Sequence, residues 1–246
     1  MTDNEHVDPL KEVYHESFVE NPAHKEFLIE GRTALLCIDL QYLDAAPGHG
    51  VFKDAMNSGV PQEAQEYYFD RLQQTVLPNV RGLQDAFRSH GLEVIHTRIQ
   101  ALTRDGRDRS KGHRRLGLLA APGSREADFL EIVGPDESRD EIVINKTASG
   151  VFSSTNLHYV LKNMGIESLF VVGVYTNECV ETTVRDACDL GYLVTVVEDC
   201  CATVTPELHD ASLATLRDRY ARILKYAEVA RMIAPLVPAD TVAPNQ

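Results

Sequence analysis

The chain has 246 residues, a net charge of −13 and a hydrophobic fraction of 43%, which suits one sizeable α/β domain. This acidic charge argues against a protein that binds the phosphate backbone of nucleic acids. No apolar run approaches the roughly 20 residues needed to cross a bilayer, and the polar start, residues 1–9, is unlike a secretory signal. We therefore expect a cytoplasmic protein with no nucleic-acid or membrane partner.

Strand-like and helical segments alternate after a charged, weakly patterned stretch at residues 1–30, which we expect to be an arm that packs on the body or on a neighbouring subunit. In chain order, the pattern predicts a strand at 33–39, a helix at 62–90 with a break or second start at Pro78, strands at 92–97 and 141–145, a helix at 154–164, a strand at 168–174, a helix at 178–190, a strand at 192–198, a helix at 206–220, and a sixth strand at 222–226 before a last helix. We expect the main domain to span 31–235 and a tail to follow at 236–246.

Near-continuous apolar strands separated by helices indicate a parallel sheet that is covered on both faces. We therefore predict one domain with a three-layer α/β/α, doubly wound fold and a mainly parallel, six-stranded sheet. In such sheets the ligand lies beyond the carboxyl ends of the strands.

A cysteine follows one of these strands at a short turn. Cys179 comes after the apolar run 168–174 and lies in the first turn of the next predicted helix. Helix N-termini favour thiolate over thiol, so the placement indicates a nucleophile. The alternative is a small buried residue that begins a helix. The other cysteines (Cys37, Cys188, Cys200 and Cys201) form no C-x-x-C pair or metal-finger spacing, which is typical of a reducing compartment.

Two further polar residues follow strands and are expected to meet Cys179 at the same edge of the sheet. Asp39 ends the first strand, and Lys146 follows the third. A carboxylate can accept the thiol proton, and an ammonium group can hold the thiolate and carboxylate in place. The alternatives are an aspartate that caps the next helix and a lysine that is solvated.

Four blocks of sequence resemble the isochorismatase-like cysteine hydrolases, a superfamily that includes nicotinamidases, N-carbamoylsarcosine amidohydrolases, ureidoacrylate amidohydrolases and biuret hydrolases. The blocks are ALLCIDLQ, INKTASGVFSSTNLHYVLKNMGI, LFVVGVYTNECVETTVRDACDLGY and VVEDCCAT, and the resemblance covers roughly residues 31–235. It implies that Asp39 is the base, Lys146 the triad lysine and Cys179 the nucleophile. It also implies a non-proline cis peptide before Tyr175, with the Tyr175 and Cys179 N–H groups directed at an oxyanion.

Nicotinamidases in this superfamily carry an Asp-x-His…His metal site just after the second strand. The corresponding stretch here, HTRIQALTRD at residues 96–105, lacks that pattern. We therefore predict no catalytic metal and no cofactor, and we expect His96 to make a structural hydrogen bond.

A basic loop follows, with Arg98, Arg104, Arg107, Arg109, Lys111, His113, Arg114 and Arg115. It is either a solvated flap or subunit contact, or a source of arginines such as Arg104 and Arg109 that bind a carboxylate or ureide oxygen. The remaining candidates for substrate binding are Gln41, Tyr42, Phe152 and Tyr175, for which ordinary packing is the alternative. Similar basic loops occur in the ureide-type branch of the superfamily.

The resemblance implies an amidohydrolase that cleaves a C–N bond of a small linear amide or ureide, such as biuret, triuret, ureidoacrylate or an N-carbamoyl acid, through a thioester on Cys179. A vinyl-ether hydrolase like isochorismatase is the second possibility, although those enzymes lack the nucleophilic cysteine. The third is a non-catalytic binding or scaffold protein, which would be expected to have lost a triad residue. The family habit and the arm favour a homodimer or homotetramer.

Overall fold

The computed structural model describes residues 10, 13–14, 27–29, 31–54, 56 and 58–236. The arm predicted for residues 1–30 and the tail predicted for 236–246 therefore lie almost entirely outside the described residues. No helix in the described part of the chain is long and apolar enough to cross a membrane.

Six parallel strands form one sheet, in the order β3-β2-β1-β4-β5-β6. The strands are β1 (Thr33–Ile38), β2 (Glu93–Ile99), β3 (Ile142–Lys146), β4 (Ser168–Val174), β5 (Leu193–Ala202) and β6 (Arg222–Leu224). All six predicted strands are present, including the short sixth one at the edge. The predicted doubly wound, three-layer fold is confirmed.

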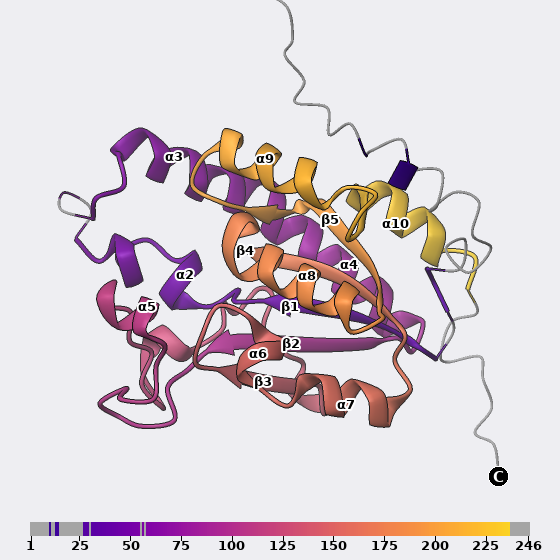
Figure 1. Ribbon diagram of the computed structural model, residues 1–246, viewed down its shortest axis with the longest axis horizontal. Helices are drawn as coiled ribbons and strands as arrows, with labels where there is room; N and C mark the ends of the chain where they lie inside the picture. Colours follow the sequence, from indigo (N-terminus) through magenta and orange to yellow (C-terminus); the bar gives the residue numbers. More distant parts are fainter. Residues whose placement is uncertain are drawn as a thin grey trace, which may run out of the picture.

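Helices of very different lengths connect the strands (Figure 1). They are α2 (Tyr42–Ala45), α3 (Gln62–Arg71), α4 (Leu77–Ser89), α5 (Lys111–Arg115), α6 (Val151–Ser154), α7 (Leu157–Met164), α8 (Glu181–Asp189), α9 (Pro206–Leu216) and α10 (Tyr226–Ile233), with short helical turns η2 (Gly50–Phe52), η3 (Leu72–Val76), η4 (Arg125–Ala127), η5 (Glu137–Arg139) and η6 (Thr176–Val180). The long segment predicted at 62–90 is one continuous run of α3, η3 and α4. Pro78 does not break it, because this residue lies in the first turn of α4, after the wider π-helical turn η3, where a missing N–H costs little.

The sheet has a hydrophobic core on each face. On β1, Ala34, Leu36 and Ile38 face one core, whereas Leu35 and Cys37 face the other. The first core is closed by residues of α7, α8 and α9, and the second by residues of α3, α4 and α10. Because both faces are covered, the six residues of β1 are all buried. A polar side chain of this segment can therefore reach a ligand or solvent only at an end of the strand.

The direction of winding reverses between β1 and β4, which are neighbours in the sheet although far apart in sequence. Chain segments that follow the two strands therefore diverge there, which leaves room for a ligand site. Figure 1 shows the short helices α2 and α5 beside each other at this end of the sheet.

Gly173 makes the close approach of β4 to β1 possible at this point. Its φ is 122°, and a Cβ built on it would lie 2.0 Å from the main-chain oxygen of Ile38. Only glycine fits, since both the backbone conformation and the available space exclude a side chain.

We predict that Gly173→Ala lowers the free energy of unfolding by more than about 3 kcal/mol, because the neighbouring backbone has to move. Chemical denaturation monitored by circular dichroism measures this change. Gly165→Ala is the control: this residue also has a positive φ, of 73°, but nothing lies within 4 Å of its added Cβ. Equal losses in the two variants would contradict the argument from close approach.

Candidate active site

The structure brings Asp39, Lys146 and Cys179 together at the carboxyl edge of the sheet. Asp39 directly follows β1 and has a left-handed φ of 51°, a conformation that aspartate tolerates better than most residues. Its N–H donates to the Thr97 carbonyl of the neighbouring strand. Lys146 is the last residue of β3, and Cys179 lies in η6, the turn that leads into α8.

Lys146 connects the other two members of the cluster. Its Nζ lies 2.8 Å from Oδ2 of Asp39 and donates to Sγ of Cys179 at 3.4 Å and to the Ala148 carbonyl at 3.0 Å. The lysine and aspartate side chains are 0% and 1% exposed. The ammonium group is therefore held by three acceptors, and it and the Asp39 carboxylate are out of contact with bulk water.

Burial controls the proton affinities of the cluster. The pKa of Cys179 is raised well above its usual value by burial, against the opposing charge of Lys146. Burial likewise raises the pKa of Asp39, although Lys146 lowers it. For Lys146, burial lowers the pKa, but the negative charge of Asp39 and its hydrogen bond, together with the neighbouring Cys179, more than offset this, and the pKa is raised.

These shifts correct the expectation that the helix start favours a thiolate at Cys179. Cys179 is 3% exposed. Transfer of a thiolate from water to this buried position costs more free energy than its attraction to the helix dipole and to Lys146 provides. The resting cysteine is a thiol, so a base has to accept its proton when it reacts. Asp39 is the carboxylate that shares the ammonium group with it.

The peptide bond between Val174 and Tyr175 is cis, as the family resemblance implies. After it, the Tyr175 carbonyl accepts from the N–H groups of Glu178 and Val180, which closes the turn around Cys179.

A chain of hydrogen bonds from α3 and α9 anchors the same turn. Nη2 of Arg71 lies 3.1 Å from Nε2 of His209, and Nδ1 of His209 lies 2.9 Å from Oγ1 of Thr176. Because arginine only donates, Nε2 accepts and Nδ1 carries the proton. Ser212 adds a bond to the Thr176 carbonyl. The sequence analysis missed this network, since no spacing signal joins residues that are so distant along the chain.

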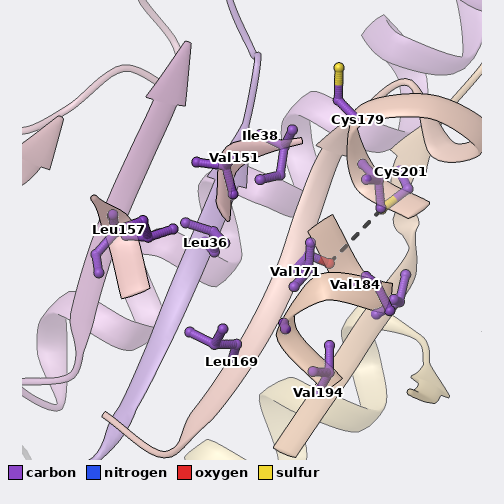
Figure 2. Packing of buried hydrophobic residues seen from close by; sticks show 14 of the residues in the cluster. Leu36, Ile38, Val151, Leu157, Leu169, Val171, Cys179, Val184, Val194 and Cys201 are labelled. Atoms are coloured by element: carbon purple, nitrogen blue, oxygen red, sulfur yellow. Dashed lines mark hydrogen bonds between the residues drawn. The ribbon is translucent and has the colours of Figure 1, made fainter. Parts of the chain in front are cut away.

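A cavity of about 200 Å³ opens in front of Cys179. Figure 2 shows the Cys179 sulfur directed away from the buried cluster around Val171 and Val184. The cavity is lined by residues from several strand ends and loops, namely Asp44, Val51, Val60, Ile99, His113, Leu116, Leu118, Tyr175, Asn177, Glu178, Cys179, Thr203, Val204 and Leu208. Of the three cluster residues, Cys179 is the one that contacts this space.

Among the six residues predicted to bind substrate, Tyr175 lines the cavity and the other five do not. Gln41 is buried, and its amide is used by the main chain: Nε2 donates to the Ile99 and Glu126 carbonyls, and Oε1 accepts from the Ile99 N–H. This residue ties the β1 end to the β2 end. The Tyr42 ring instead lies under the guanidinium of Arg125, at 3.7 Å.

The basic loop contributes a histidine to the cavity, not an arginine. Arg104 is exposed outside the lining. Arg109 donates to the carbonyls of Gly106 and Leu118 and so holds the loop in its own fold. Phe152 stacks on Tyr192 at 5.8 Å between ring centroids, on the α7–α8 side of the sheet.

His96 lies within β2, is 1% exposed and makes the structural hydrogen bond that was predicted, with Nε2 3.0 Å from Oε2 of Glu141. Glu141 is also held by Arg88, with 2.7 Å between Nε and Oε1. Within the part of the chain that the structure describes, no group of three or more His, Cys, Asp or Glu residues is arranged to hold a metal ion.

Asp44, His113 and Glu178 are polar cavity residues that the sequence analysis did not select as site residues. His113 was counted only as a member of the basic loop. Asp44 stands two residues after the predicted binding residue Tyr42, and Glu178 directly precedes Cys179. Their spacing alone carries no signal, because α2, α5 and η6 meet only in the folded chain.

A doubly wound parallel sheet with an acid, a lysine and a cysteine at its switch point defines the class of isochorismatase-like α/β hydrolases. The model of the isochorismatase domain family matches residues 33–228, and the chain belongs to that family. It is an isochorismatase-family hydrolase.

Relatives and solved structures agree with this assignment. The ureidoacrylate amidohydrolase RutB of Caulobacter segnis is 26% identical over 84% of this chain and 87% of its own length. Nicotinamidase 3 of Arabidopsis thaliana is 28% identical over 68% of this chain and 83% of its own length. A cysteine hydrolase from Pseudomonas syringae pv. phaseolicola 1448A has the same fold, with a TM-score of 0.70 and 23% identity over 85% of this chain and 96% of that one.

We predict that Lys146→Met destabilises the protein by about 3–5 kcal/mol, because it leaves Asp39 buried without its partner. The double variant Asp39→Asn/Lys146→Met removes both charges, so we expect it to be more stable than Lys146→Met alone. Urea denaturation of the three proteins measures the difference. A double variant that is as unstable as, or less stable than, the single one would show that the lysine acts mainly through packing.

We predict that stability falls as the pH drops from 7.5 to 5, in part through His209. Burial and the Arg71 charge lower the pKa of this histidine to about 4, below its unfolded value of about 6.5. Between these values the unfolded chain binds the proton and the folded one does not, so acid favours unfolding by about 2 kcal/mol at pH 5. His209→Gln should show a pH dependence smaller by that amount in denaturation curves. An unchanged slope would contradict the assignment.

Proposed function

We propose that the protein is a cysteine-dependent amidohydrolase that cleaves a C–N bond of a small linear amide or ureide. The observation that carries the proposal is the buried cluster of Asp39, Lys146 and Cys179, which lies beside a cavity that Cys179 lines. A protonated thiol beside a carboxylate of raised pKa is suited to proton transfer at the moment of attack.

In the first half of the reaction, the Cys179 sulfur forms a bond to the substrate carbonyl carbon while its proton passes to Asp39. The main-chain N–H groups of Tyr175 and Cys179 stabilise the oxyanion of the tetrahedral intermediate. The C–N bond then breaks as Asp39 returns the proton to the departing nitrogen. Ammonia or an amine leaves, and a thioester remains on Cys179.

In the second half, water adds to the thioester carbon and gives a proton to Asp39. The C–S bond breaks, and the proton returns to sulfur. Lys146 stays charged throughout, because its role is to hold the carboxylate and the thiol in position. No bound metal or cofactor takes part in either half of this scheme.

The printed names of relatives support a C–N bond as the target. RutB of Caulobacter segnis is named a ureidoacrylate amidohydrolase, and a Pseudomonas putida relative, 24% identical over 78% of this chain, is named a maleamate amidohydrolase. The small cavity favours substrates of similar size. Its volume of about 200 Å³ matches a small amide or ureide.

We predict that Cys179→Ala lowers ammonia release from a panel of amides and ureides by at least about 10⁴-fold. Cys188→Ala is the matched control, because this half-buried cysteine lies in α8 outside the cavity, and its activity should equal that of the wild type. Rapid acid quenching followed by mass spectrometry should find the acyl group on Cys179.

The panel contains nicotinamide, biuret, triuret, maleamide and N-carbamoyl compounds, and it is run with and without a chelator. Isochorismate is included as the vinyl-ether substrate. Full activity of Cys179→Ala, or turnover of isochorismate without any ammonia release, would contradict the proposal. Loss of activity with the chelator would contradict the metal-free scheme.

A further inference from the structure

Two buried polar groups face the cavity, and the mechanism proposed above does not use them. Asp44 of α2 and His113 of α5 both line the cavity and are 4% and 5% exposed. Within the described residues, Oδ2 of Asp44 and Nδ1 of His113 have no hydrogen-bond partner. Buried polar atoms are nearly always satisfied in native proteins, so two such atoms on one cavity indicate the place of a ligand.

The backbone of Asp44 is fixed, which leaves its carboxyl group for the cavity. The Asp44 carbonyl accepts from the hydroxyl of Tyr68 at 2.8 Å and from that of Tyr175 at 3.0 Å. The two tyrosine rings pack together, with 5.2 Å between their centroids. This arrangement places the carboxyl group rigidly in the wall, close to the reacting sulfur.

Burial disfavours the charged form of both groups. Burial raises the pKa of Asp44 well above its usual value, and the charge of Asp39 raises it further. Burial and the positive charges of Lys146 and Arg109 lower the pKa of His113 to about 4. A neutral carboxylic acid has one O–H donor and a carbonyl acceptor, and a neutral imidazole has one donor and one acceptor.

The cavity offers no cation to an anionic ligand. No arginine or lysine is among the described residues that line it. Apart from Cys179 and Tyr175, the ionisable side chains of the lining are those of Asp44, His113 and Glu178. Lys146 lies behind the sulfur and is already paired with Asp39. Arg109 is bound to main-chain carbonyls. A carboxylate in this cavity would lose water without gaining a counter-ion.

We propose that Asp44 and His113 are substrate-positioning residues that select an uncharged amide or ureide over one that carries a carboxylate. The inference rests on the proposed function and narrows its substrate class. The Asp44 O–H donates to an amide carbonyl, and its C=O accepts from the N–H of the same amide group, which is a complementary pair of hydrogen bonds. Nδ1 of His113 contacts a second amide or ureide nitrogen or oxygen.

Matched substrates test the selection directly. The uncharged members are N-carbamoylglycinamide and maleamide, and the anionic ones are N-carbamoylglycine and maleamate, which differ from them in one terminal group. We expect kcat/KM to favour the uncharged member by at least about 50-fold, beyond the factor of two for a second amide. Equal values, or a preference for the anionic members, would overturn the proposal.

Two variants of Asp44 test its role as a neutral group. Asp44→Asn keeps one donor and one acceptor at the same place, so kcat/KM should stay within about threefold of the wild type. Asp44→Ala should raise KM by about 10- to 100-fold, with a much smaller change in kcat. Asp210→Asn, an exposed carboxyl on α9, is the control. Equal losses in the asparagine and alanine variants would show that Asp44 acts as a charge and would overturn the assignment.

His113→Gln and His113→Leu form the second pair, used with thermal unfolding curves in case Asp44→Ala does not fold. His113→Leu should raise KM, whereas His113→Gln should have a KM close to that of the wild type. An unchanged KM in both variants would show that His113 does not bind the substrate.

Calorimetric titration of Cys179→Ala with the matched amides separates the substrate-selection hypothesis from the proposed hydrolase function. Tight binding of the uncharged members without turnover by the wild type would contradict the hydrolase alone, whereas turnover of the anionic members would contradict the selection alone.

Discussion

The ion pair of Lys146 and Asp39 is the interaction around which the site is organised. Both side chains are essentially inaccessible to water, and a charge in that environment is stable only beside its partner. The pair joins the ends of β3 and β1, which are separated in the sheet by β2. Because the same ammonium group also donates to Cys179, the position of the sulfur depends on this pair.

Burial sets the chemistry of the cysteine as well. In water, a lysine 3.4 Å from a thiol would favour the thiolate, but here the cost of desolvation exceeds that attraction and the thiol remains protonated. The same environment raises the pKa of Asp39. A raised pKa makes Asp39 a stronger proton acceptor than it is in water, which suits it to take the thiol proton during attack.

The same low-polarity surroundings extend to the cavity wall. Burial disfavours the charged forms of Asp44 and His113, as it does for Cys179, because a buried charge loses its contact with water. A surface of this kind recognises ligands through neutral hydrogen bonds. Arg109 of the basic loop donates to the main-chain carbonyls of Gly106 and Leu118, so this arginine shapes the wall without adding its charge to the cavity lining.

The sequence by itself determined the architecture and the members of the cluster formed by Asp39, Lys146 and Cys179. Strand and helix patterns are local, and the rule that parallel strands end at one edge places Asp39, Lys146 and Cys179 together without further information. The state of the thiol, the structural role of Gln41, the anchoring of the turn by His209 and the polar wall of Asp44 and His113 were decided only by the tertiary structure. Each of these depends on which side chains from distant segments exclude water from a given atom, and burial of that kind has no signature in the order of residues along the chain.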